Sequence, residues 1–290
     1  MTLVSDAATT AVLSGVELAQ EIRAQVTATA AELTDAGVPP RLAVVVATDD
    51  ESTAWYVRSI ARAASRTGIR CDVVDLGAHA APDRIRDELA ALSEDPSVHG
   101  IVLQTPLPGA ARAEELAAAL SPEKDVDGAN PVSLGRLSAG LPAFAPATAA
   151  AVLELLDHHQ VPLSGRRAVV VGRSNVVGRP VAQLLLRRDA TVTVCHRWTR
   201  DLAAHTRQAE VLVVAVGEAG LVGAEHVGPG AVVVDVGTNP TDDGGLVGDV
   251  DAGAVTGRAA GLTPVPGGVG PVTTALLLRH TVDSARRCTT

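Results

Sequence analysis

Apolar and polar positions follow two different periods along the first 104 residues of the chain. Apolar residues repeat with helical spacing over 16–36, 52–67 and 82–92, a continuous apolar run covers 42–47, and further strands are predicted over 70–75 and 99–104. Helical spacing predicts helices with one buried face, and short apolar runs predict buried strands. Because the two kinds of segment alternate, we expect a parallel sheet with helices on both faces.

The same alternation returns after residue 148. Helices are predicted over 148–159 and 272–287, and between them lie four runs rich in valine and alanine, at 168–171, 191–195, 211–216 and 231–236. A chain of 290 residues is long enough for two domains. We therefore predict an α/β fold of two domains, each a largely parallel sheet flanked by helices, with a cleft between them. The first is expected to cover 1–150 and the second 151–271, with the helix of 272–290 packing back on the first.

Composition excludes several classes of function. The formal net charge of −9 would repel a phosphate backbone, and an aromatic fraction of 1% leaves too few rings to stack nucleic-acid bases. No apolar stretch approaches the roughly 20 residues that cross a membrane. The 3 cysteines are far apart and have neither metal-type spacing nor a disulfide framework. We expect a cytoplasmic protein that binds neither nucleic acid nor membrane and holds no metal.

The second domain opens with a strand, a glycine turn and the start of a helix. The segment reads Val169-Val-Val-Gly-Arg-Ser-Asn-Val-Val-Gly-Arg-Pro180. Gly172 and Gly178 would let backbone amides approach a pyrophosphate at the helix N-terminus, as in a Rossmann-like domain. The Gly-x5-Gly spacing differs from the standard dinucleotide fingerprint, so a tight turn without a ligand is the other interpretation.

The end of the next strand favours the nucleotide interpretation. It reads Cys195-His196-Arg197, about twenty residues after the glycine turn. Dinucleotide-binding folds usually place an acid there for the adenosine ribose, whereas an arginine suits a 2′-phosphate. Arg173 and Arg197 are therefore predicted to hold NADP between them. Two solvated surface arginines are the alternative.

Two segments rich in turn residues interrupt the first domain. They are Gln104-Thr-Pro-Leu-Pro-Gly109 and Lys124-Asp-Val-Asp-Gly128. The first directly follows a predicted strand, where ligands of parallel sheets bind. In the second, Asp125 and Asp127 lack a nearby histidine or carboxylate cluster that would complete a metal site. A single carboxylate accepting two donors from a heterocycle is favoured.

A third segment, Pro264-Val-Pro-Gly-Gly-Val-Gly-Pro271, has three glycines among three prolines. Such a loop has a fixed path and exposes its amides for close contact with a ligand. A rigid crossover between the two domains is the alternative, and the two interpretations are compatible.

Together these residues resemble the bifunctional methylenetetrahydrofolate dehydrogenase/methenyltetrahydrofolate cyclohydrolase family. The resemblance extends from the Ser14-Gly-x-x-Leu-Ala opening almost to the end of the chain. Four motifs occur in the family's order: Gln104-Thr-Pro-Leu-Pro, Lys124-Asp-Val-Asp-Gly, Gly172-Arg-Ser-Asn-Val-Val-Gly and Pro266-Gly-Gly-Val-Gly-Pro.

The resemblance implies that the first domain binds a tetrahydrofolate derivative, that the second binds NADP, and that the enzyme is a homodimer through the cofactor domain. Tyr56 would stack on the folate, Gln104 would face the reacting carbon and Asp127 would accept hydrogen bonds from the pterin, and these three form the predicted catalytic set. The implied substrate-binding residues are Tyr56, Leu103, Gln104, Thr105, Asp127, Pro266, Gly267, Gly268, Val269 and Gly270. The implied cofactor-binding residues are Gly172, Arg173, Ser174, Val177, Gly178, His196, Arg197 and Thr238. The family more often has isoleucine at the position of Thr238.

One position departs from the family. Its signature is a tyrosine followed four residues later by a catalytic lysine, but Tyr56-Val-Arg-Ser-Ile60 has isoleucine there. Arg58 and Arg62 are each two residues from Ile60, about 200° round a helix, and a guanidinium does not act as a base. Hydride removal requires no proton transfer, whereas adding water and opening the ring calls for acid–base help. We therefore expect the chain to oxidise 5,10-methylenetetrahydrofolate to 5,10-methenyltetrahydrofolate with NADP, and to have weak or no cyclohydrolase activity.

Three alternatives stay open at this point. The first is a full bifunctional dehydrogenase/cyclohydrolase that uses another group in place of the lysine. The second is a non-catalytic folate- or nucleotide-binding paralogue, which would not need the cofactor turn and both arginines. The third, an amino-acid or shikimate-type dehydrogenase, does not explain the Lys124 and Pro266 motifs together.

Overall fold

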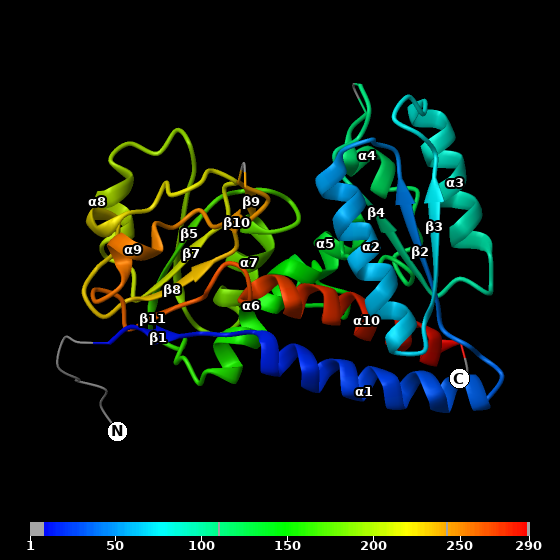
Figure 1. Cartoon of the computed structure of the whole chain (residues 1–290), viewed down its shortest axis with the longest axis horizontal. Coiled ribbons are helices and arrows are strands. Elements are labelled where there is room, and N and C mark those ends of the chain that lie inside the picture. The colour runs from blue at the N-terminus through cyan, green and yellow to red at the C-terminus, as the bar shows by residue number, and fades with distance from the viewer. Residues whose placement is uncertain (1–8, 110, 242, 289–290) are drawn as a thin grey trace. The chain divides into compact units, whose positions relative to one another are not determined.

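The computed structural model of the chain describes residues 9–109, 111–241 and 243–288. They divide into two compact units (Figure 1). Unit 1 holds the described residues up to 18 together with residues 148–272, and unit 2 holds residues 19–147 with the described residues from 273. Three helices begin in one unit and end in the other: α1 (Val16–Asp35), α6 (Ala147–His158) and α10 (Val269–Arg287).

Unit 1 is built on a parallel sheet, which among the described residues has 6 strands in the order β1-β11-β8-β7-β5-β6. Their bounds are Ala11–Val12 (β1), Arg167–Val171 (β5), Thr191–Cys195 (β6), Val211–Val214 (β7), Val232–Asp235 (β8) and Gly261–Leu262 (β11). The four longer strands confirm the predicted valine-rich runs. The two-residue strands β1 and β11 were not predicted. Because β1 pairs with β11, the described residues before α1 group with unit 1 although they lie far before the boundary expected at residue 150.

Both faces of the central strands of unit 1 are covered. Val169 and Val171 of β5 belong to a buried cluster that includes Leu212 and, partly buried, Leu202 of α8 (Leu202–Thr206). The alternate residues of β5 point to the opposite face, and α7 (Gly178–Leu186) packs against β5 and β6. Burial on both faces explains why these strands read as continuous apolar runs.

Unit 2 contains a parallel sheet in the order β3-β2-β4, with bounds Arg70–Asp75 (β3), Arg41–Val46 (β2) and Gly100–Leu103 (β4). The helices between these strands are α2 (Glu51–Arg66) and α3 (Pro82–Glu94). The side chain of Asp50 accepts from the Thr53 amide at 2.7 Å and so caps the start of α2. A buried cluster of Val45, Ile85 and Ile101, among others, joins α3 to the sheet. The α/β fold of two largely parallel sheets flanked by helices is confirmed.

The remaining elements are short and were not predicted. They are α4 (Ala113–Ala117), α5 (Pro131–Ser138), η1 (Ala224–His226), α9 (Ala252–Val255) and the antiparallel pair β9 (Asn239–Pro240) and β10 (Leu246–Val247). The last helix, α10, begins at Val269, three residues before the predicted start at 272. Val269 and Gly270 are therefore helical and not part of a loop. Pro271 fits the first turn because the amide it lacks would have had no partner within the helix.

None of the helices in the described ranges combines the length and the apolarity that spanning a bilayer requires.

Candidate functional site

Tyr56 and Ile60 lie one turn apart in α2 and therefore share one face of that helix. Tyr56 is partly exposed, whereas the side chain of Ile60 is 0% exposed. Arg58 and Arg62 are exposed, as their offset from Ile60 predicts. The position at which the resemblance leads us to expect a lysine is thus a fully buried apolar residue, one helical turn after Tyr56.

The Tyr56 hydroxyl lies near the carboxyl group of Asp127. Burial raises the pKa of Tyr56, the negative charge of Asp127 raises it further, and a hydrogen bond with Thr274 of α10 lowers it. The tyrosine is therefore a neutral hydrogen-bonding group at physiological pH. The structure brings together two of the three residues predicted for catalysis, and it adds Thr274, which the sequence did not indicate.

The pKa of the Asp127 carboxyl group is raised well above its ordinary value. Burial raises the pKa of Asp127 to about 7, and the charge of Asp125 acts in the same direction, whereas a hydrogen bond from the Ala147 amide lowers it. Asp127 therefore changes its charge close to neutral pH. This behaviour suits a carboxyl group that accepts hydrogen bonds from, or exchanges a proton with, a bound heterocycle.

The other two charged residues of the Lys124–Gly128 turn have structural partners. Asp125 is 0% exposed and accepts the amides of Ala129 at 3.0 Å and Asn130 at 2.8 Å. The ammonium group of Lys124 donates to the Asp95 carbonyl at 2.7 Å. Asp127 is therefore the remaining charged residue of this turn, and its predicted role in binding a heterocycle stays a proposal.

Helix α10 holds the same turn from the other side. Nδ1 of His280 lies 2.8 Å from the carbonyl of Val126, which directly precedes Asp127. The hydroxyl of Ser284 donates to the Glu123 carbonyl at 2.9 Å. Helix α10 thus contributes to the position of Asp127. Neither His280 nor Ser284 was predicted, because no local sequence signal links residues that are 154 and 161 positions apart.

Leu103, Gln104 and Thr105 follow one another at the carboxyl end of β4. The side chain of Gln104 is 8% exposed. The backbone amide of Gln104 donates to the Val45 carbonyl at 2.9 Å. The Thr53 hydroxyl in the first turn of α2 lies 3.3 Å from the Thr105 carbonyl. The structure therefore places these residues beside the start of the helix that carries Tyr56.

The glycine and proline loop of residues 264–268 belongs to unit 1, as do Val269 and Gly270. The Gly15 amide donates to the Gly267 carbonyl at 2.9 Å. A Cβ added at Gly268 would lie 2.6 Å from the Pro264 carbonyl oxygen. Gly268 is thus required by close backbone packing, and Gly267 by its φ of +106°. Their predicted role in holding folate remains a proposal.

The turn from β5 into α7 has room only for glycine at two positions. Gly172 has φ +126°, and a Cβ there would lie 2.2 Å from the Ala215 carbonyl oxygen. A Cβ at Gly178 would lie 2.2 Å from the Gly172 carbonyl oxygen. The hydroxyl of Ser174 accepts the amides of Val177 at 3.2 Å and Gly178 at 3.4 Å. This cradle of close-packed backbone at a helix start is the kind of setting in which a diphosphate binds.

Arg173 and Arg197 follow β5 and β6, which pair in parallel with Val171 opposite Cys195. The two arginines therefore lie at the same edge of the sheet. Both are exposed, and neither has an ion-pair partner in the described ranges. The guanidinium of Arg197 lies 5.0 Å from the centre of the Trp198 ring.

The last two predicted cofactor residues lie in turns at this edge. His196 follows β6, and its Nδ1 accepts the amide of Trp198 at 3.2 Å. Thr238 is exposed in the turn after β8. All eight predicted cofactor residues therefore lie in turns or at a helix start beyond the carboxyl ends of β5, β6 and β8.

Two buried acids of unit 1 were missed by the sequence reasoning. Asp235, 4% exposed, ends β8, and Asp249, 0% exposed, follows β10. An acid at the end of a valine-rich strand was the available signal. The described side chains form no group of three His, Cys, Asp or Glu that would hold a metal ion.

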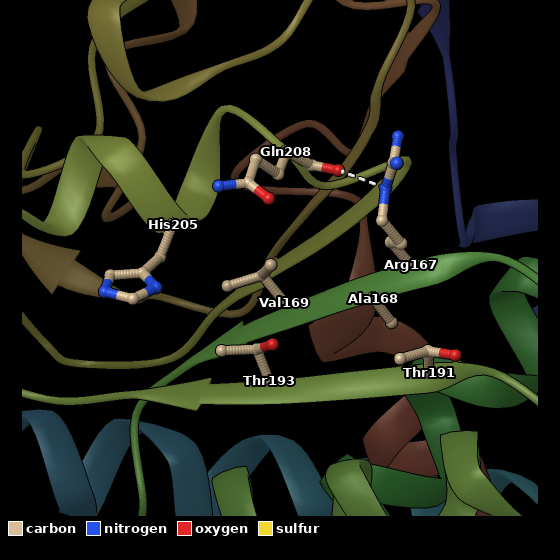
Figure 2. A pocket seen from close by; sticks show the side chains of 7 residues that line it. All are labelled: Arg167, Ala168, Val169, Thr191, Thr193, His205 and Gln208. Atoms are coloured by element: carbon tan, nitrogen blue, oxygen red, sulfur yellow. Dashed lines mark hydrogen bonds between the residues drawn. The ribbon is translucent and has the colours of Figure 1, made fainter.

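A small cavity of about 100 Å³ lies near the amino-terminal ends of β5 and β6 (Figure 2). It is lined by Arg167, Ala168, Val169, Thr191, Thr193, His205 and Gln208. Figure 2 shows these side chains coming from the two strands, from α8 and from the turn after α8, with the Arg167 guanidinium bonded to the Gln208 carbonyl. None of the predicted site residues lines it, so it lies apart from both groups described above.

Comparison with known proteins agrees with the division of these residues. Residues 13–127 match the family model of the tetrahydrofolate dehydrogenase/cyclohydrolase catalytic domain, and residues 146–289 match the model of the NAD(P)-binding domain of the same family. A curated relative, bifunctional protein FolD 1 of Saccharopolyspora erythraea, is 71% identical to this chain over 289 residues. The aligned part covers 99% of each of the two chains.

Solved structures show the same likeness. The bifunctional methylenetetrahydrofolate dehydrogenase/cyclohydrolase FolD of Campylobacter jejuni is 39% identical, with a TM-score of 0.93 over 96% of this chain and 99% of that one. The Trypanosoma brucei enzyme, solved with NADP cofactor and an inhibitor, is 37% identical, with a TM-score of 0.92 over 97% and 99%. The chain belongs to the tetrahydrofolate dehydrogenase/cyclohydrolase family.

Proposed function

We propose that the chain oxidises 5,10-methylenetetrahydrofolate to 5,10-methenyltetrahydrofolate with NADP+ and has lost most of the cyclohydrolase activity of its family. The family membership supports the oxidation. The observation that carries the second part is Ile60, a fully buried apolar side chain one helical turn after Tyr56, where the family has a catalytic lysine.

The residues of unit 1 fit NADP. Gly172 and Gly178 let the backbone of the turn approach the start of α7 closely, and a helix start of this kind favours a diphosphate. Arg173 and Arg197 would bind the 2′-phosphate, which a cofactor with a free 2′-hydroxyl lacks. The chemistry supplied by bound NADP+ is acceptance of the hydride.

The residues of unit 2 would hold the folate. Tyr56 would stack on its ring system, Asp127 would accept hydrogen bonds from the pterin, and Gln104 would face the reacting carbon. Hydride leaves that carbon with its electron pair, and the resulting cation is shared by the two adjacent nitrogens. No proton has to move in this step, so correct placement of the substrate is the main contribution of these side chains.

Hydrolysis of the methenyl product requires more. Water adds to the cation, and protons must then move as the ring opens, a task for which a positioned acid or base contributes about 10²- to 10⁴-fold. Ile60 has no proton to exchange. Arg58 and Arg62 are exposed, and Lys124 is bonded to the Asp95 carbonyl. These side chains therefore offer no replacement for the missing lysine.

One observation favours the alternative of a full bifunctional enzyme. Asp127 lies near the Tyr56 hydroxyl, and burial raises the pKa of Asp127 to about 7. Such a carboxyl group is suited to exchange protons at neutral pH. In that case the Asp127→Asn variant would lose an enzyme-dependent hydrolysis that the unchanged protein possesses.

The proposed oxidation is tested by NADPH formation from methylenetetrahydrofolate, with shikimate and amino acids as control substrates. We expect turnover with the folate alone. The cofactor preference is tested by kcat/KM with NADP+ and with NAD+. Equal values for the two cofactors would contradict the role given to Arg173 and Arg197.

We also propose a cytoplasmic homodimer that associates through unit 1. Strand β6 ends the sheet of that unit in the described part of the chain, and its Val194 is 40% exposed. An edge strand with an exposed apolar residue is suited to pair with a second copy. The cytoplasmic location is supported by Cys71, Cys195 and Cys288, which are all free thiols.

A further inference from the structure

Asp235 and Asp249 form a pair of buried carboxylates that the proposed reaction does not use. Asp235 is the last residue of β8, and Asp249 lies two residues after β10. Placing two acids side by side in the interior is costly unless hydrogen-bond donors surround them. The donors therefore show what the pair holds in place.

The carboxylate of Asp249 accepts hydrogen bonds from three backbone amides of the turn that follows β7. Its Oδ2 accepts the amides of Val216 at 2.7 Å and Gly217 at 3.0 Å, and its Oδ1 accepts the amide of Glu218 at 2.9 Å. The side-chain amide of Asn239, in the segment after β8, also donates to Oδ1 at 2.9 Å. One side chain thus fixes the turns after two neighbouring strands.

The carboxylate of Asp235 holds Asp249 in turn. Its Oδ1 accepts the amides of Asp249 at 3.0 Å and Gly237 at 2.9 Å, and its Oδ2 accepts the amide of Val250 at 3.0 Å. A Cβ added at Gly237 would lie 2.3 Å from the Asp249 carboxyl group. The arrangement is therefore packed tightly around both acids.

These turns lie at the edge of the sheet proposed to bind NADP. The adenosine 2′-phosphate is assigned to Arg173 and Arg197, beyond β5 and β6. A dinucleotide spans the point where the strand order reverses, which here is beside β5, so its other half extends over β7 and β8. The turn of residues 216–218 and Thr238 lie on that side.

We infer that Asp249, supported by Asp235, is a positioning residue that holds residues 216–218 and 237–239 in place to bind the nicotinamide ribose half of the cofactor. This inference rests on the proposed NADP function. Asp249 itself is 0% exposed and touches no cofactor; it acts through the backbone groups that it gathers. Loss of its charge frees donors in the turn after β7, whereas the two arginines assigned to the 2′-phosphate follow β5 and β6.

The test compares two ligands on the purified full chain by calorimetric titration. NADP+ contains both halves of the cofactor, whereas adenosine 2′,5′-bisphosphate contains only the half assigned to the arginines. We expect Asp249→Asn to weaken NADP+ binding by about 10-fold or more and to change bisphosphate binding by less than about 2-fold, because replacing a charged acceptor of several hydrogen bonds costs at least this much.

Asp251→Asn is the matched control. Asp251 is exposed, lies two residues further on and accepts the Ala254 amide at 3.0 Å, so its replacement should change neither affinity. Unchanged NADP+ binding in Asp249→Asn would overturn the inference, and so would an equal loss of affinity for both ligands.

Asn239→Ala provides a milder variant if Asp249→Asn does not fold. It removes one donor to the Asp249 carboxylate and leaves both acids in place. A loss of about 3-fold or more for NADP+ alone supports the inference, and no loss contradicts it. If the protein without any substitution bound neither NADP+ nor adenosine 2′,5′-bisphosphate, the proposed NADP function would be contradicted instead.

Discussion

At the scale of single residues, we propose that Ile60 separates the two reactions of the family. The side chain is 0% exposed and lies one turn after Tyr56. The oxidation depends on placement, which Tyr56, Gln104 and Asp127 can provide without a base. The hydrolysis depends on proton transfer, for which Ile60 supplies no group.

Ile60→Lys is expected to create an enzyme-dependent hydrolysis of methenyltetrahydrofolate. Burial lowers the pKa of a lysine, so part of the amine would be unprotonated and able to act as a base near neutral pH. The gain is expected to be about 10-fold or more, together with some loss of thermal stability because a polar group enters an apolar site.

Ile60→Met serves as the control for that variant, since methionine keeps the site apolar at a cost of less than about 1.5 kcal/mol. Methenyltetrahydrofolate loss is followed for both variants by absorbance. A folded Ile60→Lys protein with no gain over Ile60→Met would contradict the role given to this position.

The raised pKa of Asp127 implies a pH dependence of the free energy of unfolding. Its pKa is raised from 3.8 to about 7 in the folded state, mainly by burial. Between these two values the folded protein binds more protons than the unfolded chain, so this residue makes the free energy of unfolding fall as pH rises from about 4 to about 7. Asp127→Asn should remove that part of the fall.

We therefore expect Asp127→Asn to be more stable than the unchanged protein at pH 8, by on the order of 1–2 kcal/mol, and to differ little from it at pH 4. Urea unfolding at several pH values measures the difference. Asp235, whose pKa is raised to about 6, contributes the same trend in both proteins and cancels in the comparison. A variant less stable than the unchanged protein at pH 8 would count against a buried, partly charged Asp127.

At the scale of elements, the long strands and helices were predictable and the short ones were not. Strands such as β5 bury both faces and therefore appear as continuous valine runs. In contrast, β1 and β11 have two residues each and exist because they pair with one another and, for β11, with β8. Pairing between positions 250 residues apart leaves no local pattern in the sequence.

The turn between β5 and α7 predicts a difference between two glycine substitutions. A Cβ at Gly178 would lie 2.2 Å from the Gly172 carbonyl oxygen, so Gly178→Ala has to move backbone atoms of the cradle. We expect NADP+ affinity to fall by about 10-fold or more, with a lower midpoint of thermal unfolding.

Gly135→Ala is the matched control in a helix interior. Gly135 lies in α5, is exposed, and a Cβ there would meet nothing within 4 Å. This change should stabilise the protein by about 0.5–1 kcal/mol and leave NADP+ affinity unaltered. If Gly178→Ala bound NADP+ as well as Gly135→Ala does, the cradle would not be a cofactor site.

At the scale of the whole molecule, the predicted site residues fall into two sets. The sequence motifs identified members of both, since each motif contains unusual glycine, proline or acidic residues. The residues that hold these members in place were not identified: His280 contacts the carbonyl of Val126 from far along the chain, and Asp249 gathers turns from separate strands. Such supporting contacts follow from the three-dimensional fold and have no spacing rule.

The proposed homodimer predicts that the exposed edge of β6 is needed for association. Val194→Lys should convert a dimer into a monomer in sedimentation experiments, because a charge in the strand pairing would have to be buried. Val73→Lys is the matched control: Val73 is 48% exposed on β3, at the edge of the sheet in unit 2. A monomeric unchanged protein, or dissociation caused equally by both substitutions, would contradict association through β6.

The most direct test of the central proposal is the hydrolysis of methenyltetrahydrofolate by the unchanged protein. The purified chain is first shown to form NADPH from methylenetetrahydrofolate, and the same preparation is then mixed with methenyltetrahydrofolate without NADP+. Loss of the methenyl compound is compared with the spontaneous rate in the same buffer. A rate at or only slightly above the spontaneous one is the result we predict, and rapid hydrolysis in proportion to the amount of protein would contradict it.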